Sequence, residues 1–311
     1  MRAVMLHEAG DPGALRTAEV PRPVPGEGEL LVEVEAMAVA YYEIGVRTGV
    51  FPMPGGLPAV FGFEAAGRIT EGPRSGQRVV VLTRTGGAYA EYLAVPEEAV
   101  TPIPDGVSAV DALAVAVPGA VALALLRKAA LRDERILVQA AGSGGVGSYL
   151  IQLARARGAR HITATVGGER KRRLAEDLGA DLVLDHNDPQ WTERVPRGLG
   201  VVFDAVGGRT AAKLLDALEP GPGRMLCYGM LGGEPAAVGV ADLGYRELTL
   251  ATCMGASWFP QVSAARPEVL DLLARGRLRA LVHETMPMEE VAKAHELVEG
   301  RSALGRIILR P

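Results

Sequence analysis

The sequence predicts a two-domain α/β protein in which a β-rich domain precedes a doubly wound parallel sheet. Its 311 residues suit about two domains. The first third holds short β-type runs at residues 30–36, 78–82 and 90–95. Turns rich in Pro and Gly separate these runs, as is typical of an antiparallel β-rich domain. After about residue 108, short apolar strands alternate with helical segments, which predicts βαβ units and a parallel sheet.

The elements of the second region follow one another in a regular order. A strand over residues 136–140 precedes a helix, because Val146 begins an apolar series at the spacing i, i+3, i+4, i+7 and i+8. Further strands are expected at residues 161–165, 181–184, 199–203 and 224–228. The tail returns to helices and ends in a strand over residues 305–309, which we expect to rejoin the first domain.

Composition favours a cytoplasmic protein that acts on a small-molecule substrate. The net charge is −4 and no basic tract is long, so nucleic acid is not an expected partner. The longest apolar run, residues 112–126, is shorter than the ~20 residues of a spanning helix, and Pro118 interrupts it. The first residues lack an apolar signal core. We therefore expect no membrane segment.

Cysteine and histidine usage predicts neither a disulfide nor a metal site. The two cysteines, Cys227 and Cys253, are far apart and belong to no paired motif, which indicates two buried thiols in a reducing cytosol. The five histidines are scattered, and no two of them have ligand spacing on a common helix face.

A glycine-rich turn joins the strand at 136–140 to the following helix. It spans residues 141–147 and reads AGSGGVG. Glycines let the backbone turn sharply and approach a diphosphate, which binds the free N–H groups at a helix N-terminus. Gly-rich turns are also common in ordinary loops, but this one follows a strand and opens a helix. The context predicts a dinucleotide site in a Rossmann domain.

The residues after the second strand favour NADPH over NADH. An NAD site usually has an acidic residue at that strand tip, but here residues 165–168 read TVGG. Glu169 follows, and then four cations at 170–173 (RKRR). Cations at a helix start oppose the helix dipole, and a 2′-phosphate would pair with them. A solvated helix face is the alternative, and Glu169 leaves NAD open.

Together with further motifs, these residues resemble the quinone oxidoreductase (ζ-crystallin-like) branch of the zinc-independent medium-chain dehydrogenases/reductases. The motifs are GFEAAG at 62–67, GGAYAEY at 86–92, FDAVGG at 203–208, GRMLCYG at 223–229 and GRIIL at 305–309. The resemblance covers essentially the whole chain. As an ordered set, the motifs are specific to the superfamily and not to a substrate.

The resemblance implies a GroES-like catalytic domain over residues 1–110, completed by 258–311, and a Rossmann domain over 111–257. It also implies NADPH in the cleft between them and a homodimer joined through the edges of the Rossmann sheets. Carried over by position, the cofactor-binding residues would be Ser143, Gly144, Gly145, Val146, Gly167, Gly168, Arg170, Lys171, His186, Gly207, Tyr228, Gly229, Met230 and Cys253. For His186 alone, a surface turn histidine is the alternative.

The zinc enzymes of the superfamily carry a His where this chain has Phe63, a Cys ligand in the first domain and a four-cysteine lobe. The first domain here contains no cysteine, so neither zinc site can form. The resemblance therefore implies that substrate activation depends on hydrogen bonds or protonation, with no metal as Lewis acid.

The sequence departs from the branch where polar groups normally lie near the nicotinamide. The usual Asn is Ala40, and the usual Asp is Glu43. A Thr-Ala-Tyr segment is replaced by residues 123–125, LAL. We also expect Glu43 and Arg47, four residues apart, to pair on a short helix, and a role in shaping the cleft is the alternative. The loss of polar groups puts ordinary quinone chemistry in question.

Tyr41 is the candidate catalytic residue. It stands where some polyketide enoyl reductases have a Tyr that protonates the substrate after hydride addition, and a phenol can donate such a proton. The alternative for Tyr41 and the neighbouring Tyr42 is a core or cleft-wall aromatic.

The leading hypothesis is NADPH-dependent reduction of a conjugated acceptor: a quinone, an enone or alkenal, or an enoyl thioester. A biosynthetic enzyme that catalyses a non-redox cyclisation or isomerisation on the same fold is the second hypothesis. A nucleotide-binding protein without catalysis is the third. Pocket shape depends on distant segments, so the sequence does not name the substrate.

Overall fold

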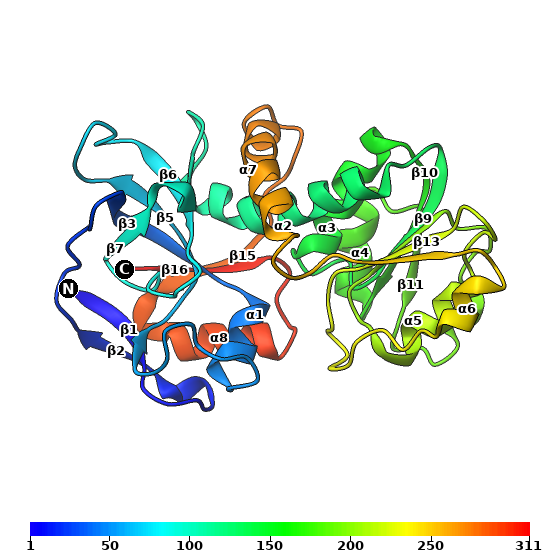
Figure 1. The fold of residues 1–311 in the computed structure, drawn as a ribbon, viewed down its shortest axis with the longest axis horizontal. Coiled ribbons are helices and arrows are strands. Elements are labelled where there is room, and N and C mark those ends of the chain that lie inside the picture. Colours follow the sequence, from blue (N-terminus) through cyan, green and yellow to red (C-terminus); the bar gives the residue numbers. More distant parts are fainter. The chain divides into compact units, whose positions relative to one another are not determined.

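The computed structural model describes all of residues 1–311, which form two compact units (Figure 1). Unit 1 comprises residues 1–117 and 266–311, and unit 2 comprises residues 118–265. Two helices, α2 (Ala109–Ala129) and α7 (Phe259–Ala274), each run from one unit into the other. The divisions at 117 and 265 therefore lie within helices, further along the chain than the boundaries expected after residues 110 and 257.

Unit 1 is built around a seven-stranded sheet with the order β15-β16-β3-β5-β6-β8, in which β7 also pairs with β3. The strands are β3 (Glu29–Val39), β5 (Glu64–Ile69), β6 (Arg78–Leu82), β7 (Tyr92–Pro96), β8 (Val100–Pro102), β15 (Val282–Pro287) and β16 (Arg306–Arg310). A smaller sheet, β2-β1-β4, contains β1 (Arg2–Leu6), β2 (Leu15–Glu19) and β4 (Ala59–Val60). Because β16 pairs antiparallel with β3, the chain's last strand does rejoin the first domain, as predicted.

The core of unit 1 lies between these sheets and two helices, α1 (Tyr41–Arg47) and α8 (Val291–Glu299). Strand β3 is buried along most of its length and contributes Val34 and Met37 to one hydrophobic cluster and Ala36 and Ala38 to another, so both of its faces are covered. An aromatic cluster fills the centre, where Phe61 makes edge-to-face contacts with Phe63 and Tyr89. This cluster lies directly beneath the start of α1, because Tyr42 of that helix packs against Phe63.

Unit 2 is a six-stranded parallel sheet with the order β11-β10-β9-β12-β13-β14, the doubly wound arrangement predicted from the sequence. The strands are β9 (Glu134–Val138), β10 (Ala159–Val166), β11 (Leu182–Asp185), β12 (Val201–Asp204), β13 (Arg224–Cys227) and β14 (Thr249–Thr252). The helices are α3 (Val146–Ala154), α4 (Glu169–Asp177), α5 (Gly208–Leu215) and α6 (Val240–Gly244). The strand order reverses direction at β9, and the glycine-rich turn follows this strand.

Single 3-10 turns complete the chain at η1 (Pro12–Ala14), η2 (Glu97–Ala99), η3 (Arg155–Arg157), η4 (Trp191–Arg194) and η5 (Met288–Glu290). Helix α2 differs from its sequence description: it continues through Pro118 for 21 residues, so the expected interruption there is wrong. By length and composition it could cross a membrane, but 78% of its most apolar window is buried inside the fold. That burial is typical of a core helix.

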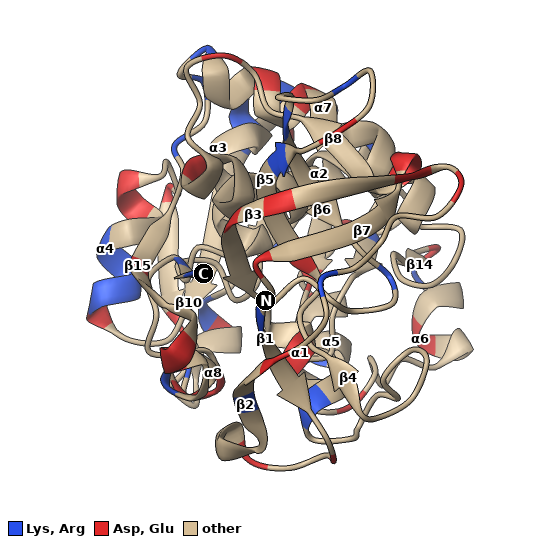
Figure 2. Cartoon of the chain, turned by 90° about the vertical axis from the view of Figure 1, so that its left-hand side faces the viewer, with Lys and Arg blue, Asp and Glu red and all other residues tan.

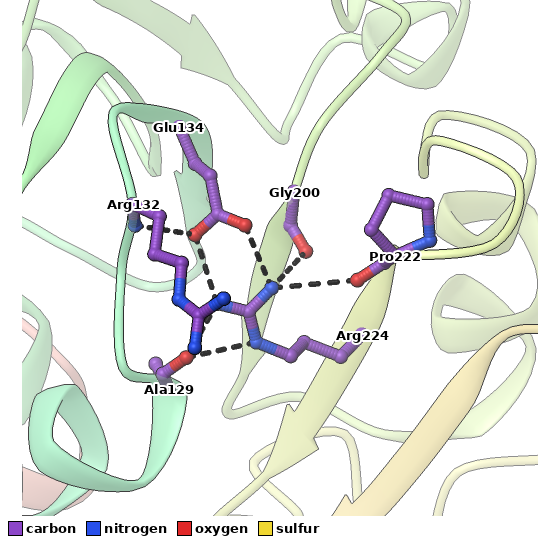
Figure 3. A network of polar contacts seen from close by, with 6 residues as sticks. All are labelled: Ala129, Arg132, Glu134, Gly200, Pro222 and Arg224. Carbon is purple, nitrogen blue, oxygen red and sulfur yellow. Dashed lines mark hydrogen bonds and ion pairs between the residues drawn. The ribbon is translucent and has the colours of Figure 1, made fainter.

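An ion-pair network fixes the amino ends of the unit 2 strands (Figure 3). The Arg224 guanidinium donates to both oxygens of Glu134, each at 2.8 Å, and also to the carbonyl of Ala129. Burial acts to raise the pKa of Glu134, but the hydrogen bonds from Arg224 and from the Arg132 N–H outweigh it, so this pKa is lowered. The network is at the opposite end of the strands from the glycine-rich turn, and its role is structural.

Candidate cofactor and catalytic sites

The glycine-rich turn has the close backbone packing that its sequence predicts. Gly142 has φ +134°, and a Cβ there would lie 2.6 Å from the carbonyl oxygen of Lys171. A Cβ on Gly147 would lie 2.8 Å from the Cα of Ala141. In contrast, a Cβ on Gly145 would meet nothing within 4 Å. Gly142 and Gly147 are thus required by packing, whereas Gly145 borders open space at the start of α3.

The N–H groups at this helix start suit a phosphate. The Gly144 N–H donates to the Ser148 hydroxyl at 3.0 Å, which holds the turn in place. The first N–H groups of a helix have no acceptor within it and bind anions readily. Ser143, Gly145 and Val146 are partly exposed beside them, and Gly144 is buried. This part of the chain therefore fits the diphosphate of a dinucleotide.

The second group of expected cofactor residues meets at the ends of β10 and β11. A Cβ on Gly167 would lie 2.8 Å from the His186 ring nitrogen and 3.5 Å from the Asn187 side chain, so these residues are adjacent. The His186 N–H donates to the carbonyl of Val166 at 2.8 Å. Gly168 has φ +89° and precedes the first residue of α4. The structure therefore brings Gly167 and His186 together, and Gly168 lies next to Gly167 at the start of α4.

The basic run at the start of α4 divides into two pairs. Glu169 forms ion pairs with Arg172 and Arg173 at 3.6 and 3.0 Å, and Arg172 also donates to the carbonyl of Val183 at 2.6 Å. Arg170 is exposed and forms no ion pair, and Lys171 is partly exposed. Figure 2 shows the adjoining cationic and acidic bands on α4. Arg173 thus belongs to a charged helix face in solvent, which was the alternative to phosphate binding. Arg170 and Lys171 are the candidates for binding a 2′-phosphate.

The third group surrounds the ends of β12 and β13. Gly207 has φ +76°, and a Cβ there would lie 2.2 Å from the carbonyl oxygen of Glu234. A Cβ on Gly229 would lie 2.8 Å from the carbonyl oxygen of Ala205. Both glycines are therefore sites of close backbone approach. Met230 is 39% exposed, and Tyr228 is partly buried.

Asp204 is a buried residue to which the sequence assigned no role. Its Oδ1 accepts the N–H groups of Val206 and Gly207, both at 3.0 Å, and so shapes the turn that carries Gly207. Its Oδ2 is buried without a hydrogen-bond partner. Burial and then the Asp204 charge raise the pKa of Tyr228. Only its position at a strand end could have drawn attention to Asp204 in the sequence.

Both cysteines are buried and unpaired, as predicted. Burial, followed by the charge of Asp204, raises the pKa of Cys227 to about 12. Burial raises the pKa of Cys253 to about 11. The Cys253 N–H donates to the carbonyl of Cys227 at 2.7 Å, which extends the β13–β14 pairing. Neither thiol is a nucleophile at neutral pH, because only the thiolate reacts.

In unit 1 Tyr41 occupies the first position of α1 and is 43% exposed. Its hydroxyl oxygen accepts a hydrogen bond from Arg301 at 3.0 Å, and the guanidinium carbon lies 5.5 Å from the ring centroid. Tyr42 is 49% exposed and stacks on Phe51 at 5.5 Å. Neither tyrosine is a core residue. The Tyr41–Arg301 contact joins residues 260 positions apart, and the sequence contained no sign of it.

Glu43 does not pair with Arg47, so that expectation is wrong. The Glu43 carboxylate is buried and accepts hydrogen bonds from the Tyr89 hydroxyl, the Ala40 N–H and the Phe63 N–H. Arg47 donates instead to Glu299 at 2.7 Å and to the Gly10 carbonyl at 2.8 Å. The i, i+4 spacing permits a pair on an exposed helix face, but both of these side chains are buried and bind other segments.

Two further expected positions can be placed. Phe63, at the position of the zinc-ligand His, is buried against Phe61 and Tyr42. No group of three His, Cys, Asp or Glu side chains has an arrangement that could hold a metal ion. Leu123 and Leu125 are fully buried, so they provide no exposed surface to a ligand. The two leucines that replace the polar Thr and Tyr of the family segment thus pack into the interior.

Comparisons with known proteins agree with this architecture. A family model described as alcohol dehydrogenase GroES-like domain matches residues 26–105, and one described as zinc-binding dehydrogenase matches residues 145–275. The quinone oxidoreductase of Salmonella typhimurium is 32% identical, covering 99% of each chain. The 2-haloacrylate reductase of a Burkholderia species is 30% identical, covering 99% of this chain and 98% of its own.

Solved structures are similar over the full length of the chain. The Escherichia coli quinone oxidoreductase complexed with NADPH superposes with a TM-score of 0.89 at 27% identity and covers 100% of both chains. An NAD-dependent alcohol dehydrogenase also superposes with a TM-score of 0.89, at 29% identity and with the same coverage. Similar folds thus accommodate either nicotinamide cofactor, so the choice between them depends on local residues.

Proposed function

The chain belongs to the quinone oxidoreductase branch of the medium-chain dehydrogenases/reductases, and we propose that it reduces a conjugated acceptor by hydride transfer without zinc. It is an NADPH-dependent oxidoreductase. The acceptor class we propose comprises quinones, enones or alkenals, and enoyl thioesters. The observation that carries the proposal is the open glycine turn at the start of α3, where Gly145 borders free space beside unpaired helix N–H groups.

The assignment of individual cofactor residues is part of the proposal. Ser143, Gly144, Gly145 and Val146 would hold the diphosphate through backbone N–H groups. Gly167, Gly168 and His186 would surround the adenosine ribose, and Arg170 and Lys171 would bind its 2′-phosphate. Gly207, Tyr228, Gly229, Met230 and Cys253 would border the second ribose and the nicotinamide. The ion pairs of Glu169 with Arg172 and Arg173 favour NADPH over NADH. They hold the carboxylate that could otherwise bind the ribose hydroxyls of NADH.

Zinc independence is supported by the chemistry of the side chains in unit 1. Phe63 occupies the position of a zinc-ligand His, and both cysteines belong to unit 2. A phenyl ring has no lone pair for a metal. Bound NADPH supplies a hydride, and the protein must then stabilise the charge that develops on the acceptor oxygen through hydrogen bonding and proton donation.

Tyr41 is the proposed proton donor. A guanidinium has only donor groups, so the Tyr41 oxygen must be the acceptor in its contact with Arg301. The hydroxyl proton of Tyr41 is therefore directed away from Arg301 and can be given to a substrate. The residue is 43% exposed, so part of it is open to solvent.

The test is NADPH oxidation by the purified protein with a panel of quinones, enones and enoyl thioesters. We expect turnover with at least one class, and Tyr41→Phe should lower kcat by about 10- to 1,000-fold for enones, which need a proton at carbon or oxygen. Tight NADPH binding without turnover of any member would reject the reductase proposal.

We also propose a homodimer that acts in the cytoplasm. Strand β14 is an edge strand of the unit 2 sheet and offers unpaired backbone groups to a second copy. Val240 and Tyr245, just before it in the chain, are 87% and 91% exposed, which supports an uncovered apolar surface there. Light scattering of the purified protein should give twice the monomer mass.

A further inference from the structure

The Glu43 carboxylate links three segments of unit 1 at the start of α1. Its Oε2 accepts the Ala40 N–H at 2.8 Å and the Tyr89 hydroxyl at 2.6 Å. Its Oε1 accepts the Phe63 N–H at 3.0 Å. The side chain is fully buried, so no solvent competes for these donors. One carboxylate thus ties the residue before α1 to the residue before β5 and to the loop that carries Tyr89.

We propose that Glu43 is a positioning residue which, as a carboxylate, fixes the first turn of α1 and with it the Tyr41 hydroxyl, and that protonation of Glu43 releases this turn. The inference rests on the proposed function, because it concerns the group assigned there as proton donor. Glu43 itself touches neither substrate nor cofactor in this account. It acts on Tyr41 through the backbone of residues 40–43.

The charge of the carboxyl group matters because all of its partners are donors in the charged state. Two of the three, the N–H groups of Ala40 and Phe63, can never accept a proton. A proton added to Oε2 weakens the bond from Ala40, and a proton added to Oε1 weakens the bond from Phe63. In either case one backbone tether is left without a strong acceptor, which is costly in a buried site. Only the Tyr89 oxygen could accept the new proton.

The surroundings place this change in an accessible pH range. Burial raises the pKa of Glu43 to about 7, and the bonds from Tyr89 and Ala40 limit the rise. Two charged groups also act on it: Glu64 raises the pKa and Arg306 lowers it, and these two form an ion pair of their own at 2.6 Å. The pKa of Tyr89 lies well above its usual value, mainly through burial.

The neighbouring groups on α1 and α8 are a buried histidine and an ion pair. The His295 ring lies 6.2 Å from the Tyr89 ring, and burial lowers the pKa of His295 to about 3. Arg47, one turn along α1 from Glu43, is paired with Glu299. The charged groups around Glu43 are thus held in ion pairs of their own, and the imidazole of His295 has its pKa lowered by burial to about 3.

The consequence is an acidic limb in the pH dependence of the reductase. Reduction consumes a proton, so without Glu43 the rate should not fall on acidification. With Glu43 as proposed, kcat falls as the pH decreases through about 7, by about tenfold for each pH unit below the pKa. The KM for NADPH should change little, because the expected cofactor residues belong to unit 2.

The experiment compares four proteins over a pH series of kcat and KM: wild type, Glu43→Gln, Tyr89→Phe and Glu33→Gln. Glu33 is a matched control, because it is exposed and accepts a hydrogen bond from Tyr92 at 3.2 Å. Glu43→Gln should have a low kcat without an acidic limb. Tyr89→Phe should move that limb to higher pH, because it removes a bond that lowers the Glu43 pKa. Glu33→Gln should behave as wild type.

A second readout is independent of turnover. The amide signals of Ala40 and Phe63 in the NMR spectrum of the wild type should titrate together near pH 7, and this titration should be absent in Glu43→Gln. Amides that do not titrate, or an acidic limb that survives in a folded Glu43→Gln protein, would overturn the inference. If no acceptor is turned over, the proposed function fails, while the amide titration still decides whether Glu43 controls the turn.

Discussion

In unit 2 the groups assigned to the diphosphate are backbone groups, placed by a short run of sequence between β9 and α3. In unit 1 the corresponding groups are side chains, and each is held by a partner far away in the sequence. Tyr41 contacts Arg301, and Glu43 contacts Tyr89. The first kind of site is built by local conformation, whereas the second requires the folded domain. Mutations should therefore affect stability most in unit 1 and ligand affinity most in unit 2.

The largest effect is expected from the buried ion pair of unit 1. Glu64 and Arg306 are bonded at 2.6 Å, with side chains only 4% and 12% exposed. Removing Glu64 with Glu64→Ala leaves a buried guanidinium without its partner, so the free energy of unfolding should fall by about 3–5 kcal/mol. Denaturant unfolding measures this change.

The exposed pair Arg155–Asp181 of unit 2 is the matched control. Its side chains are 49% and 36% exposed, and Asp181→Ala should cost no more than about 1 kcal/mol beyond the loss of its bond to the Ile162 N–H. If Glu64→Ala and Asp181→Ala lowered the free energy of unfolding equally, the expectation that unit 1 is the more sensitive to mutation would be wrong.

The next effect is the response of stability to pH. The pKa of Glu43 is raised by burial from 4.5 to about 7, so its contribution to stability is fully present below pH 4.5 and is lost as the pH rises through 7. Asp181 has the opposite sign. Burial acts to raise its pKa, but bonds from the Ile162 N–H and Arg155 lower it overall, so its contribution is lost on acidification.

The wild type loses this contribution as the pH rises from 4.5 through 7, whereas Glu43→Gln cannot ionise and has no such loss. The free energy of unfolding of Glu43→Gln, relative to that of wild type, should therefore increase across this range by up to about 3 kcal/mol. A proton on Glu43 therefore has two opposite effects. It raises the free energy of unfolding because it neutralises a buried charge, and it weakens a hydrogen bond that holds the first turn of α1 in place. Thermal unfolding at several pH values measures the difference. A difference between the two proteins that is constant with pH would contradict the assignment of the raised pKa to Glu43.

A smaller and more selective effect is expected in unit 2. The double variant Arg170→Ala, Lys171→Ala should weaken NADPH binding by about 10- to 100-fold, because charge-assisted bonds to the 2′-phosphate are lost. NADH affinity should be unchanged. Arg173→Ala is the control, since Arg173 pairs with Glu169. Titration of the intrinsic fluorescence measures both affinities, and equal losses for NADPH and NADH would reject the phosphate assignment.

Most of the fold could be predicted because its signals are local. The helix predicted from the apolar series at Val146 is α3, the strand predicted at 78–82 is β6, and the expected final strand joins unit 1 as β16. Pro118 was misjudged because a buried helix can tolerate the loss of one hydrogen bond where packing holds it in place. Tertiary packing therefore overrode the local signal at α2.

The candidate site could be predicted only in part. Gly142 could be identified because a turn that approaches another backbone needs glycine, whereas Gly167, which packs against the His186 and Asn187 side chains, could be identified only through the family resemblance. The partners of Glu43 and Arg47 could not, because the i, i+4 rule applies to an exposed helix face and both side chains are buried. Asp204 acts locally, because it accepts the N–H of Gly207 three residues further on, whereas Arg301 reaches Tyr41 only in the folded domain.

The most direct test of the central claim is transfer of deuterium from NADPH labelled at C4 of the nicotinamide. With an enone or enoyl thioester as acceptor and one of the two C4 epimers, we expect the reduced product to carry one deuterium at its electrophilic carbon and one NADP⁺ to form for each product. A product without label, formed while the cofactor remains unchanged, would contradict the reductase account and favour a non-redox reaction on the same fold.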